Sequence, residues 1–467
     1  MAERCQKFIG GEWTDSESGE TFENRNPANP DDLVGIYQQS TADDTAAAVD
    51  VAVDAASEWA GTPAPARGKI LARTASELAD RKQELTETLT REEGKTRSEA
   101  GGEVQRAIDI FEYYAGKARD LGGTVKAASG DRTTLSTRQE PLGTVGLITP
   151  WNYPIAIPAW KIAPALATGN TIVFKPATLA PEVSRKLVEC LDDAGLPDGV
   201  LGYVTGPGSV VGDEIASNEA VDAVSFTGSA QVGDAVYETA VATQKRVQLE
   251  MGGKNPVVVT ASADVEKAAD IAASGAFGVT GQACTATSRA IVHETNYEAF
   301  LAAIIERAEA ETVAPGLEDD GMGPQVSKRE LEETRDYIDA GQREGATLEV
   351  GGGRVDRTGH FVEPTVFSDV NPEMRIAQEE IFGPVLAVIP VADFEEGVAV
   401  ANDVEYGLSA SIVTEDLTRA HEFVDAIDAG VVKINEKTTG LELHVPFGGV
   451  KASSSETYRE QGDAALD

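Results

Sequence analysis

Three short apolar runs decide the fold: Thr144-Val-Gly-Leu-Ile-Thr149, Asn170-Thr-Ile-Val-Phe174 and Ala223-Val-Ser-Phe226. Helical stretches such as 180–194 lie between them. Short continuous apolar runs that alternate with helices are typical of parallel strands buried on both faces. We therefore expect an α/β chain built on a parallel sheet that helices cover on both sides.

A second set with the same texture follows residue 250. Helices are expected upstream over 41–120, chiefly 43–60 and 66–90, and a polar, β-prone ribbon over 125–140. The pattern predicts two doubly wound parallel-sheet domains that meet near 249–255, plus a small β appendage. The strand candidates of the second set are 256–259, 290–293, 385–389, 409–413 and 431–435, with helices over 264–277 and 317–344.

Length and composition indicate an ordinary globular protein of two or three domains. The chain has 467 residues, of which 41% are hydrophobic and 25% charged, close to average usage. No apolar run approaches the roughly 20 residues that span a bilayer, and the first residues, Met1-Ala-Glu-Arg-Cys5-Gln, lack the apolar core of a signal peptide. The three cysteines, Cys5, Cys190 and Cys284, form no metal-ligand pattern. We expect no metal site and a reducing cytoplasm.

The charge balance is extreme. Asp and Glu number 78 against 39 Lys and Arg, which gives a formal net charge of −39. Such self-repulsion destabilises a compact fold at low ionic strength, but at about 1 M salt the Debye length falls to about 3 Å. We expect a protein from a high-salt cytoplasm, with an ordinary acidic protein as the alternative. Nucleic-acid binding is disfavoured, because phosphates need positive partners.

The strongest chemical signal is Phe277-Gly-Val-Thr-Gly-Gln-Ala-Cys284-Thr-Ala-Thr-Ser-Arg289. A cysteine among glycines and small polar residues is a candidate nucleophile; the alternative is a small buried hydrophobe. A nucleophilic cysteine reacts as the thiolate, so it needs a basic partner or a local positive field. Glu250, at the end of an apolar strand and before Gly252-Gly, is the candidate base, because partial burial raises a carboxyl pKa. An ordinary carboxylate at a turn is the alternative.

Two further turns follow predicted strands. In Thr149-Pro-Trp-Asn152-Tyr-Pro the prolines restrict the turn and could hold the Asn152 amide as an oxyanion donor. In Phe226-Thr-Gly228-Ser-Ala-Gln-Val-Gly233 the glycines allow close approach of a dinucleotide phosphate to a helix N-terminus. A turn-closing Asn and a tight packing turn are the respective alternatives.

Taken together, these motifs resemble the aldehyde dehydrogenase superfamily over nearly the whole chain, from Phe8–Trp13 to Pro446–Gly449. The resemblance implies that fold, with a small β oligomerisation arm. The motifs that occur in order are Pro150-Trp-Asn152, Phe174-Lys175-Pro-Ala177, Phe226-Thr-Gly228-Ser229, Leu249-Glu250-Met-Gly-Gly-Lys254, Gly281-Gln-Ala-Cys284 and Glu379-Glu380-Ile-Phe382-Gly-Pro384.

The resemblance also implies roles. Cys284 would attack the aldehyde, Asn152 and the Cys284 backbone N–H would stabilise the oxyanion, and hydride transfer to the nicotinamide would leave a thioester. Glu250 would activate the hydrolytic water, with Lys161 as a proton-relay residue. Lys175 would bind the adenosine ribose or its phosphate, and Glu380 and Phe382 the nicotinamide ribose and ring. The other implied NAD(P) contacts are Thr149, Pro150, Trp151, Ala177, Thr178, Gly208, Phe226, Gly228, Ser229, Gly233 and Gly252.

Cofactor choice depends on position 178, where strongly NAD-selective relatives carry Glu. A carboxylate there repels a 2′-phosphate, by several kcal/mol at about 4 Å and an effective dielectric near 20. Thr178 removes this repulsion and Lys175 supplies positive charge. We therefore expect NADP to be accepted and preferred over NAD.

The last quarter indicates the substrate and the assembly. Residues 435–449, Ser453-Ser454 and Arg459-Glu-Gln-Gly462 resemble ketoglutarate semialdehyde (2,5-dioxopentanoate) dehydrogenases, which act in pentose and sugar-acid breakdown. Another semialdehyde dehydrogenase, such as one for succinate semialdehyde, is the alternative. Relatives continue beyond this motif into a strand at the subunit interface, whereas this sequence stops at Asp467, which puts the completeness of that element in doubt. A homodimer or homotetramer is expected.

The expected domains are a dinucleotide-binding domain (1–123 and 142–249), a catalytic domain (250–449) and an oligomerisation arm (124–141 and 450–467). An acylating enzyme that uses coenzyme A would not need Glu250. A catalytically silent, cofactor-binding relative would not need Cys284, Glu250 and Asn152 together.

Overall fold

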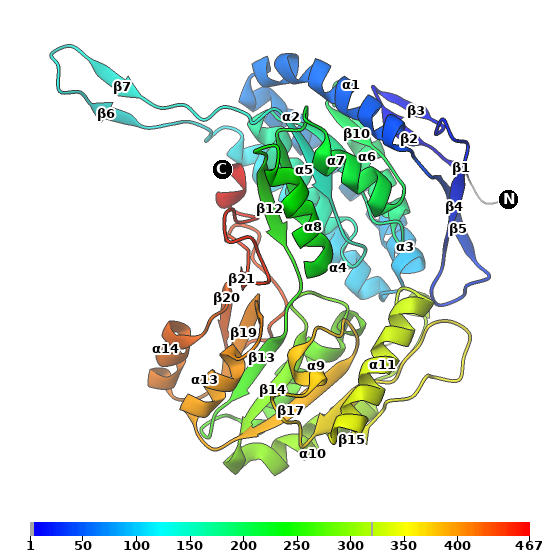
Figure 1. Cartoon of the computed structure of the whole chain (residues 1–467), viewed down its shortest axis with the longest axis vertical. Helices are drawn as coiled ribbons and strands as arrows, with labels where there is room; N and C mark the ends of the chain where they lie inside the picture. Colours follow the sequence, from blue (N-terminus) through cyan, green and yellow to red (C-terminus); the bar gives the residue numbers. More distant parts are fainter. Residues whose placement is uncertain (1–3, 319–320) are drawn as a thin grey trace.

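In a computed structural model the described residues are 4–318 and 321–467. Met1–Glu3 of the segment considered as a leader, and residues 319–320 of the predicted helix 317–344, lie outside the described residues. Two bodies, each built on a seven-stranded sheet, lie one above the other, and the chain passes between them after β12 (Figure 1).

The first sheet has the strand order β12-β11-β8-β9-β10-β2-β3. Its first five strands are parallel, which confirms the predicted strands 144–149, 170–174 and 223–226. An N-terminal hairpin that was not expected extends this parallel sheet at one edge, where β2 pairs antiparallel with β10 and β3 pairs antiparallel with β2. The strands are β2 (Lys7–Ile9), β3 (Glu12–Thr14), β8 (Thr144–Ile148), β9 (Thr171–Lys175), β10 (Leu201–Tyr203), β11 (Ala223–Thr227) and β12 (Arg246–Glu250).

Eight α-helices of the described chain surround this sheet. The threonines before α1 and α4 each form a capping box, with Asp44 and Glu99 respectively, which satisfies the first free N–H groups of those helices. The helix predicted over 66–90 is two helices, because the chain turns at Arg81, whose side chain contacts Glu189 of α6. The helices are α1 (Ala42–Gly61), α2 (Ala64–Asp80), α3 (Lys82–Glu93), α4 (Arg97–Lys117), α5 (Ala156–Thr168), α6 (Pro181–Asp193), α7 (Asp213–Ser217) and α8 (Ala230–Val241).

The second sheet has the order β15-β16-β17-β14-β13-β19-β20, and β15 alone runs antiparallel to its neighbour. All five strand candidates of this half are confirmed. The helix expected over 317–344 begins only at residue 328, where Ser327 caps it. The elements are β13 (Asn255–Val259), α9 (Val265–Phe277), β14 (Thr287–His293), α10 (Glu294–Ala310), α11 (Lys328–Glu344), β15 (Thr347–Val350), β16 (Thr365–Ser368), α12 (Arg375–Gln378), β17 (Val385–Val391), α13 (Phe394–Asn402), β19 (Ser409–Val413), α14 (Leu417–Ala426) and β20 (Val431–Ile434).

Three small sheets and four short helical turns complete the described chain. The predicted ribbon is a two-stranded hairpin, β6 with β7, which stands away from the main body (Figure 1). The remaining elements are β1 (Arg4–Cys5), β4 (Thr21–Arg25), β5 (Leu33–Gln38), β6 (Val125–Ala127), β7 (Thr134–Ser136), η1 (Gly208–Gly212), η2 (Gly278–Gly281), η3 (Gly316–Glu318), β18 (Tyr406–Gly407), β21 (Val450–Lys451) and η4 (Ala464–Leu466).

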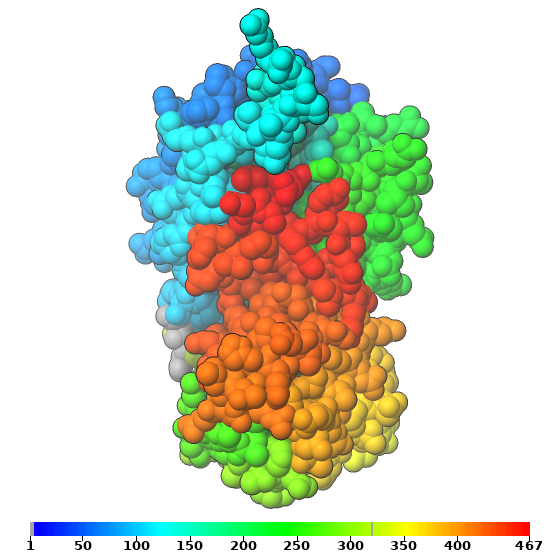
Figure 2. Space-filling model, turned by 90° about the vertical axis from the view of Figure 1, so that its left-hand side faces the viewer, coloured from blue at the N-terminus to red at the C-terminus, as the bar shows by residue number. Residues whose placement is uncertain are grey.

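The C-terminal segment returns to the first body. Ser454 forms a bridge with Glu250, and the Tyr114 hydroxyl of α4 donates to the Gly462 carbonyl at 3.0 Å. In space-filling view this segment lies directly below the hairpin (Figure 2). Throughout the described ranges, no helix has the length and apolar character needed to cross a membrane.

Candidate active site

Four strand ends of the first sheet meet at one edge. The parallel register places Ile148 beside Lys175 and Phe226, and Thr227 beside Glu250. In open α/β sheets, ligands bind outside the carboxyl ends of the strands. The chain crosses to the second body immediately after β12 (Figure 1), and a hydrogen bond from Asn152 to Gln282 joins this edge to the turn that carries Cys284.

The Cys284 turn lies between η2 and β14, and its backbone is held from two sides. The Asn255 side-chain amide donates to the carbonyls of Cys284 and Ala286, both at 2.8 Å. A side chain at Gly253 would approach the Cys284 carbonyl to 2.8 Å, so glycine is needed there. Asn255, which the sequence analysis did not single out, therefore fixes the position of Cys284.

The charges around Cys284 decide between the two ways of activating it. Burial raises the pKa of the thiol, and the carboxylates of Glu380, Glu250 and Glu460 raise it further. The positive field considered as one route is thus not what surrounds this sulfur. Both effects favour the thiol over the thiolate, so we expect a neighbouring base to take the proton of Cys284 when it reacts.

Asn152 is held by contacts that its flanking prolines do not provide. Its side-chain amide donates to the Gln282 carbonyl at 3.0 Å, two residues before Cys284. Its own carbonyl accepts from the Lys95 ammonium at 2.7 Å. The rigidity expected from the prolines comes largely from these two bonds.

Lys95 belongs to a buried charge cluster in the turn between α3 and α4. Its ammonium lies 2.7 Å from Glu103 and 3.8 Å from Glu93. Burial opposes the charged form, but Glu103 and Glu93 outweigh it and raise the pKa of Lys95. The other Glu103 oxygen accepts from the backbone N–H groups of Ile155 and Ala156, at 3.0 and 3.2 Å. The cluster therefore supports the whole turn that carries Asn152.

Glu250 is buried at the end of β12 with both carboxyl oxygens occupied. One accepts from the Gly449 N–H at 3.2 Å and the other from the Ser454 hydroxyl at 3.3 Å. Burial raises the pKa of Glu250 well above its usual value, and Glu460 adds to this effect. A buried carboxyl with a raised pKa suits a general base that works near neutral pH.

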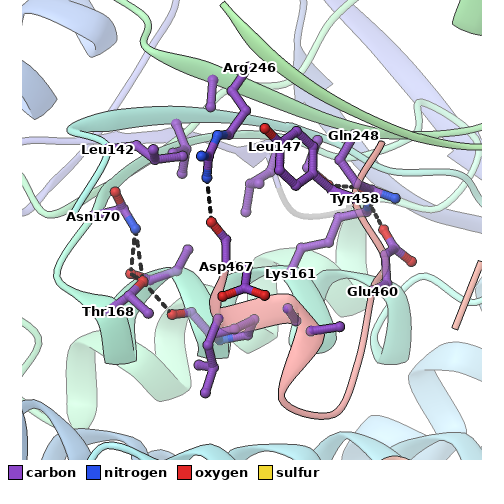
Figure 3. A pocket seen from close by; sticks show the side chains of 18 of the residues that line it. Leu142, Leu147, Lys161, Thr168, Asn170, Arg246, Gln248, Tyr458, Glu460 and Asp467 are labelled. Carbon is purple, nitrogen blue, oxygen red and sulfur yellow. Dashed lines mark hydrogen bonds and ion pairs between the residues drawn. The ribbon is translucent and has the colours of Figure 1, made fainter. Parts of the chain in front are cut away.

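Lys161 lies behind Glu250 in a polar group that sequence reasoning found only in part. Its ammonium forms an ion pair with Glu460 and donates to the Ser225 hydroxyl at 2.6 Å and to Gln248 at 3.3 Å. These side chains line a cavity of about 140 Å³ (Figure 3). Glu460 belongs to the Arg459-Glu-Gln-Gly462 motif, from which the sequence predicted the substrate but no catalytic role.

On the opposite side, the end of β9 carries a lysine without an acidic partner. Burial lowers the pKa of Lys175 to about 8, and its ammonium donates to the Pro176 carbonyl at 3.0 Å. The buried hydroxyls of Thr149 and Thr227 have no hydrogen-bond partner among the described residues. Three polar groups at neighbouring strand ends thus remain available to a ligand.

A second incomplete group surrounds Glu380. Its carboxylate accepts from the Gly253 N–H at 3.1 Å, and a side chain at Gly252 would approach it to 2.0 Å. Burial raises the pKa of Glu380 to about 7. The neighbouring Lys254 ammonium has no hydrogen bond among the described residues, and burial lowers its pKa to about 7.

The remaining candidate cofactor residues fall in three places. Trp151 and Phe382 come from different bodies and meet edge to face, 5.3 Å between ring centroids. Gly228 and Ser229 precede α8, whereas the Gly233 Cα faces Met251 and leaves no room for a side chain, which favours the packing alternative at that glycine. Ala177 and Thr178 follow β9, Gly208 begins η1, Pro150 precedes Trp151, and Phe226 is the second-last residue of β11.

Comparisons with known proteins agree with this arrangement. The sequence profile of the aldehyde dehydrogenase family matches residues 13–467. The chain belongs to the aldehyde dehydrogenase family. It is 64% identical to an alpha-ketoglutarate semialdehyde dehydrogenase of Haloferax volcanii, over 100% of this chain and 98% of that relative. It is 48% identical to an alpha-ketoglutaric semialdehyde dehydrogenase of Bacillus subtilis, over 98% and 95%. A crystal structure of an NAD-dependent aldehyde dehydrogenase from Sinorhizobium meliloti superposes with a TM-score of 0.97 and 36% identity, over 99% and 92%.

Several functional candidates had no sequence signal of their own. Lys95 and Glu103 lie in a helical region without a motif, and Lys254 stood in a quoted motif without a role. Their closeness to the catalytic turns is seen only in the folded structure. Within residues 4–318 and 321–467, no group of three or more His, Cys, Asp or Glu side chains is arranged to hold a metal ion.

Proposed function

We propose that this aldehyde dehydrogenase oxidises an aldehyde to a carboxylic acid through a thioester on Cys284. The observation that carries the proposal is the meeting of three groups from separate segments, namely the turn after β8, the end of β12 and the turn before β14. Asn152 bonds to the loop that leads into Cys284, and Glu250 acts on the pKa of the Cys284 thiol. A nucleophile, an amide donor and a buried base are the set that acyl transfer through a thiol requires.

The roles follow from where each group lies. The Asn152 amide and the Cys284 backbone N–H would hold the carbonyl oxygen as it gains negative charge. In the hydrolytic step Glu250 would take a proton from water while the hydroxide adds to the thioester carbon. The carbon–sulfur bond would then break, the product would leave as a carboxylate, and the proton that it gives up would return to the Cys284 sulfur. Lys161 and Glu460 would carry the proton from Glu250 towards the adjoining cavity.

A nicotinamide dinucleotide fits the incomplete groups on the other side. Lys175 and the buried hydroxyls of Thr149 and Thr227 would hold the adenosine end and the phosphates, with Glu380 at the nicotinamide ribose. When bound, this cofactor supplies the hydride acceptor. Thr178 places no carboxylate beside the 2′-position, so we propose that NADP is accepted and preferred. The solved relative from Sinorhizobium meliloti is described as NAD-dependent, which makes a direct comparison necessary.

The proposed substrate is 2-oxoglutarate semialdehyde, oxidised to 2-oxoglutarate in pentose or sugar-acid breakdown. Two relatives at 64% and 48% identity carry that activity in their names. Succinate semialdehyde is the nearest alternative in size and charge. The formal net charge of −39 supports work in a high-salt cytoplasm.

We also propose a role for each domain and an oligomeric assembly. The first body (1–123 and 142–249) would bind the dinucleotide and the second (250–449) would carry Cys284, with 124–141 and 450–467 as the oligomerisation arm. The side chains of Val125 and Leu135 on the hairpin are 73% and 50% exposed. An isolated two-stranded hairpin is marginally stable at best, so a second copy of the chain would cover it in a homodimer or homotetramer.

A panel of aldehydes assayed with NAD and NADP in molar KCl tests the proposal. We expect the highest kcat/KM with 2-oxoglutarate semialdehyde, and reduced cofactor in equal amount to the acid formed. A thiol-labelling assay in parallel should show that the aldehyde protects Cys284. Protein that binds cofactor but oxidises none of the aldehydes would be a catalytically silent relative, and the proposal would be wrong.

A further inference from the structure

A half-buried arginine on α4 contacts the C-terminal segment, one helical turn from the residue that supports the backbone after Asn152. Arg106 follows Glu103 by one helical turn, and Glu103 accepts from the backbone of Ile155 and Ala156 after the catalytic turn. Residues three apart on a helix share a face, so Arg106 points towards the same region. On its other side its guanidinium donates to the Gln461 side-chain oxygen at 3.0 Å.

Arg106 is short of partners. A guanidinium carries five N–H donors, and the bond to Gln461 is its one hydrogen bond among the described residues, which also offer it no ion pair. Burial lowers the pKa of Arg106, against the weaker opposite effect of Glu442 and Asp109. On the same side of the catalytic groups, the buried lysines Lys95 and Lys161 each contact a carboxylate.

Gln461 supplies a buried donor without a partner beside it. Its side chain is 1% exposed, and its amide nitrogen has no hydrogen-bond partner in the described part of the chain. Its backbone φ is +60°, a strained conformation for a residue other than glycine. Buried polar groups are normally paired, and one left open in a native protein indicates a ligand or water.

The location connects these donors with the reaction. The preceding residue, Glu460, pairs with Lys161 and acts on the pKa values of both Glu250 and Cys284. The Glu460 backbone also pairs with Phe447, directly before the Gly448-Gly449 turn that binds Glu250. The donors therefore lie close behind the base.

We propose that Arg106 and Gln461 form the subsite that binds the carboxylate of the aldehyde substrate. The inference rests on the proposed function and adds the residues that would select an anionic aldehyde over a neutral one. A guanidinium and an amide N–H₂ on one side of an anion present parallel donors to the two carboxylate oxygens. Binding the carboxylate there would satisfy both residues at once.

Substrate charge separates this role from a structural one. For Arg106→Met we expect kcat/KM with 2-oxoglutarate semialdehyde to fall about 10- to 100-fold, mainly through KM, as charge-assisted hydrogen bonds are lost. With propanal, which has no carboxylate, the change should stay below about threefold, because the lost bonds have no counterpart in that substrate. Arg106→Lys should recover part of the loss, and Gln461→Leu should act in the same direction, less strongly.

Tyr114→Phe is the matched control. It removes the bond from α4 to Gly462 and loosens the same segment without removing a charge. Any loss of activity in this variant should be equal for the two aldehydes. If Arg106→Met also lowers both activities equally, Arg106 is merely structural and the subsite is wrong.

Inhibition by 2-oxoglutarate separates the subsite from the proposed substrate. It is measured against propanal oxidation, and we expect it in the wild-type protein and its loss in Arg106→Met. Inhibition that depends on Arg106, without oxidation of the semialdehyde, would uphold the subsite and refute the substrate. Inhibition that Arg106→Met leaves unchanged would overturn the subsite. So would a wild-type protein that 2-oxoglutarate does not inhibit and that does not prefer anionic aldehydes to neutral ones.

Discussion

Four buried lysines surround the catalytic groups, and they fall into two regions that differ in one respect. Lys95 and Lys161, on the side of the acid–base groups, each contact a buried carboxylate. Lys175 and Lys254, on the proposed cofactor side, have no carboxylate within ion-pair distance among the described residues, and burial lowers their pKa values to about 8 and about 7.

The difference indicates which half of the site is complete in the free protein. A buried charge is stable when it is paired and costly when it is not. The acid–base region therefore holds its geometry without a ligand, whereas the cofactor region gains stability when an anion arrives. We therefore expect the catalytic turn to keep its geometry in the free protein and the proposed cofactor to complete the site when it binds.

The largest effect is expected on the acid–base side, from Glu250→Gln. The variant keeps the shape of the side chain but removes the base, so hydrolysis of the thioester should slow about 10²- to 10³-fold. Rapid mixing should show a burst of reduced cofactor followed by a slow phase. Equal slowing of acylation and hydrolysis would show that Glu250 is not specifically the hydrolytic base.

The raised pKa of Glu250 also sets the direction of the pH dependence. The carboxylate form acts as the base, so the hydrolytic rate in the wild type should rise with pH through this pKa. Because the folded-state pKa lies above the unfolded value, the stabilising contribution is complete at low pH and is lost as pH rises through the folded pKa. Glu250→Gln should flatten both dependences on the alkaline side.

Removing the paired lysine, with Lys95→Met, should come next in size. It leaves Glu103 and Glu93 buried without a cation and frees the Asn152 carbonyl. Breaking a buried pair typically costs about 3–5 kcal/mol of stability, and we expect kcat to fall about 100-fold through misplacement of Asn152.

A double variant tests how Lys95 acts. If it acts through Asn152, adding Lys95→Met to Asn152→Ala should cause little further loss of kcat. Lys7→Met is the control, because Lys7 forms a buried pair with Asp44 at 2.9 Å far from the catalytic turns. The losses from Lys7→Met and Asn152→Ala should multiply. If the losses from Lys95→Met and Asn152→Ala also multiply, Lys95 acts on the fold as a whole.

On the cofactor side, Thr178→Glu should shift selectivity. The new carboxylate would repel a 2′-phosphate, so kcat/KM for NADP should fall at least about tenfold more than that for NAD. In the wild type, NADP should give the higher kcat/KM. A wild-type selectivity of tenfold or more for NAD would show that Lys175 without an acidic partner does not favour the phosphate.

The smallest effect is expected from salt, which should change the thermal stability of the whole protein and should not distinguish the two regions. The charge of −39 is spread over the surface, so the thermal midpoint should rise from low salt to molar KCl. Buried pairs such as Lys95 with Glu103 are screened much less. A midpoint that stays flat or falls with KCl would refute the halophilic interpretation.

The sequence was sufficient to predict the candidate site residues that lie at or directly after a regular strand. The strands 144–149, 170–174 and 223–226 are apolar throughout, and the motif residues Asn152, Lys175 and Glu250 stand at or after strand ends. The short N-terminal strands β2 and β3 were missed, because two or three residues carry too little periodicity. The break at Arg81 was missed because Arg81 contacts Glu189, which is distant in the sequence and leaves no local pattern.

The supporting residues of the site could not have been found from one sequence. Lys95, Glu103 and Glu460 lie 57, 52 and 299 positions from the groups they contact, at Asn152, Ile155 and Lys161. Their separation along the chain leaves no local pattern. The prolines near Asn152 predicted a rigid turn, but they gave no sign of the hydrogen bonds to Gln282 and Lys95.

The central claim is that Cys284 carries the substrate as a thioester, and trapping that species tests it most directly. Glu250→Gln mixed with 2-oxoglutarate semialdehyde and NADP, quenched in acid and digested, should give the Cys284 peptide with the mass of the added acyl group. The adduct should require the cofactor and should be absent from Cys284→Ala, which should also lack aldehyde oxidation. An unmodified Cys284 peptide during turnover, or an acyl group on another residue, would contradict the account.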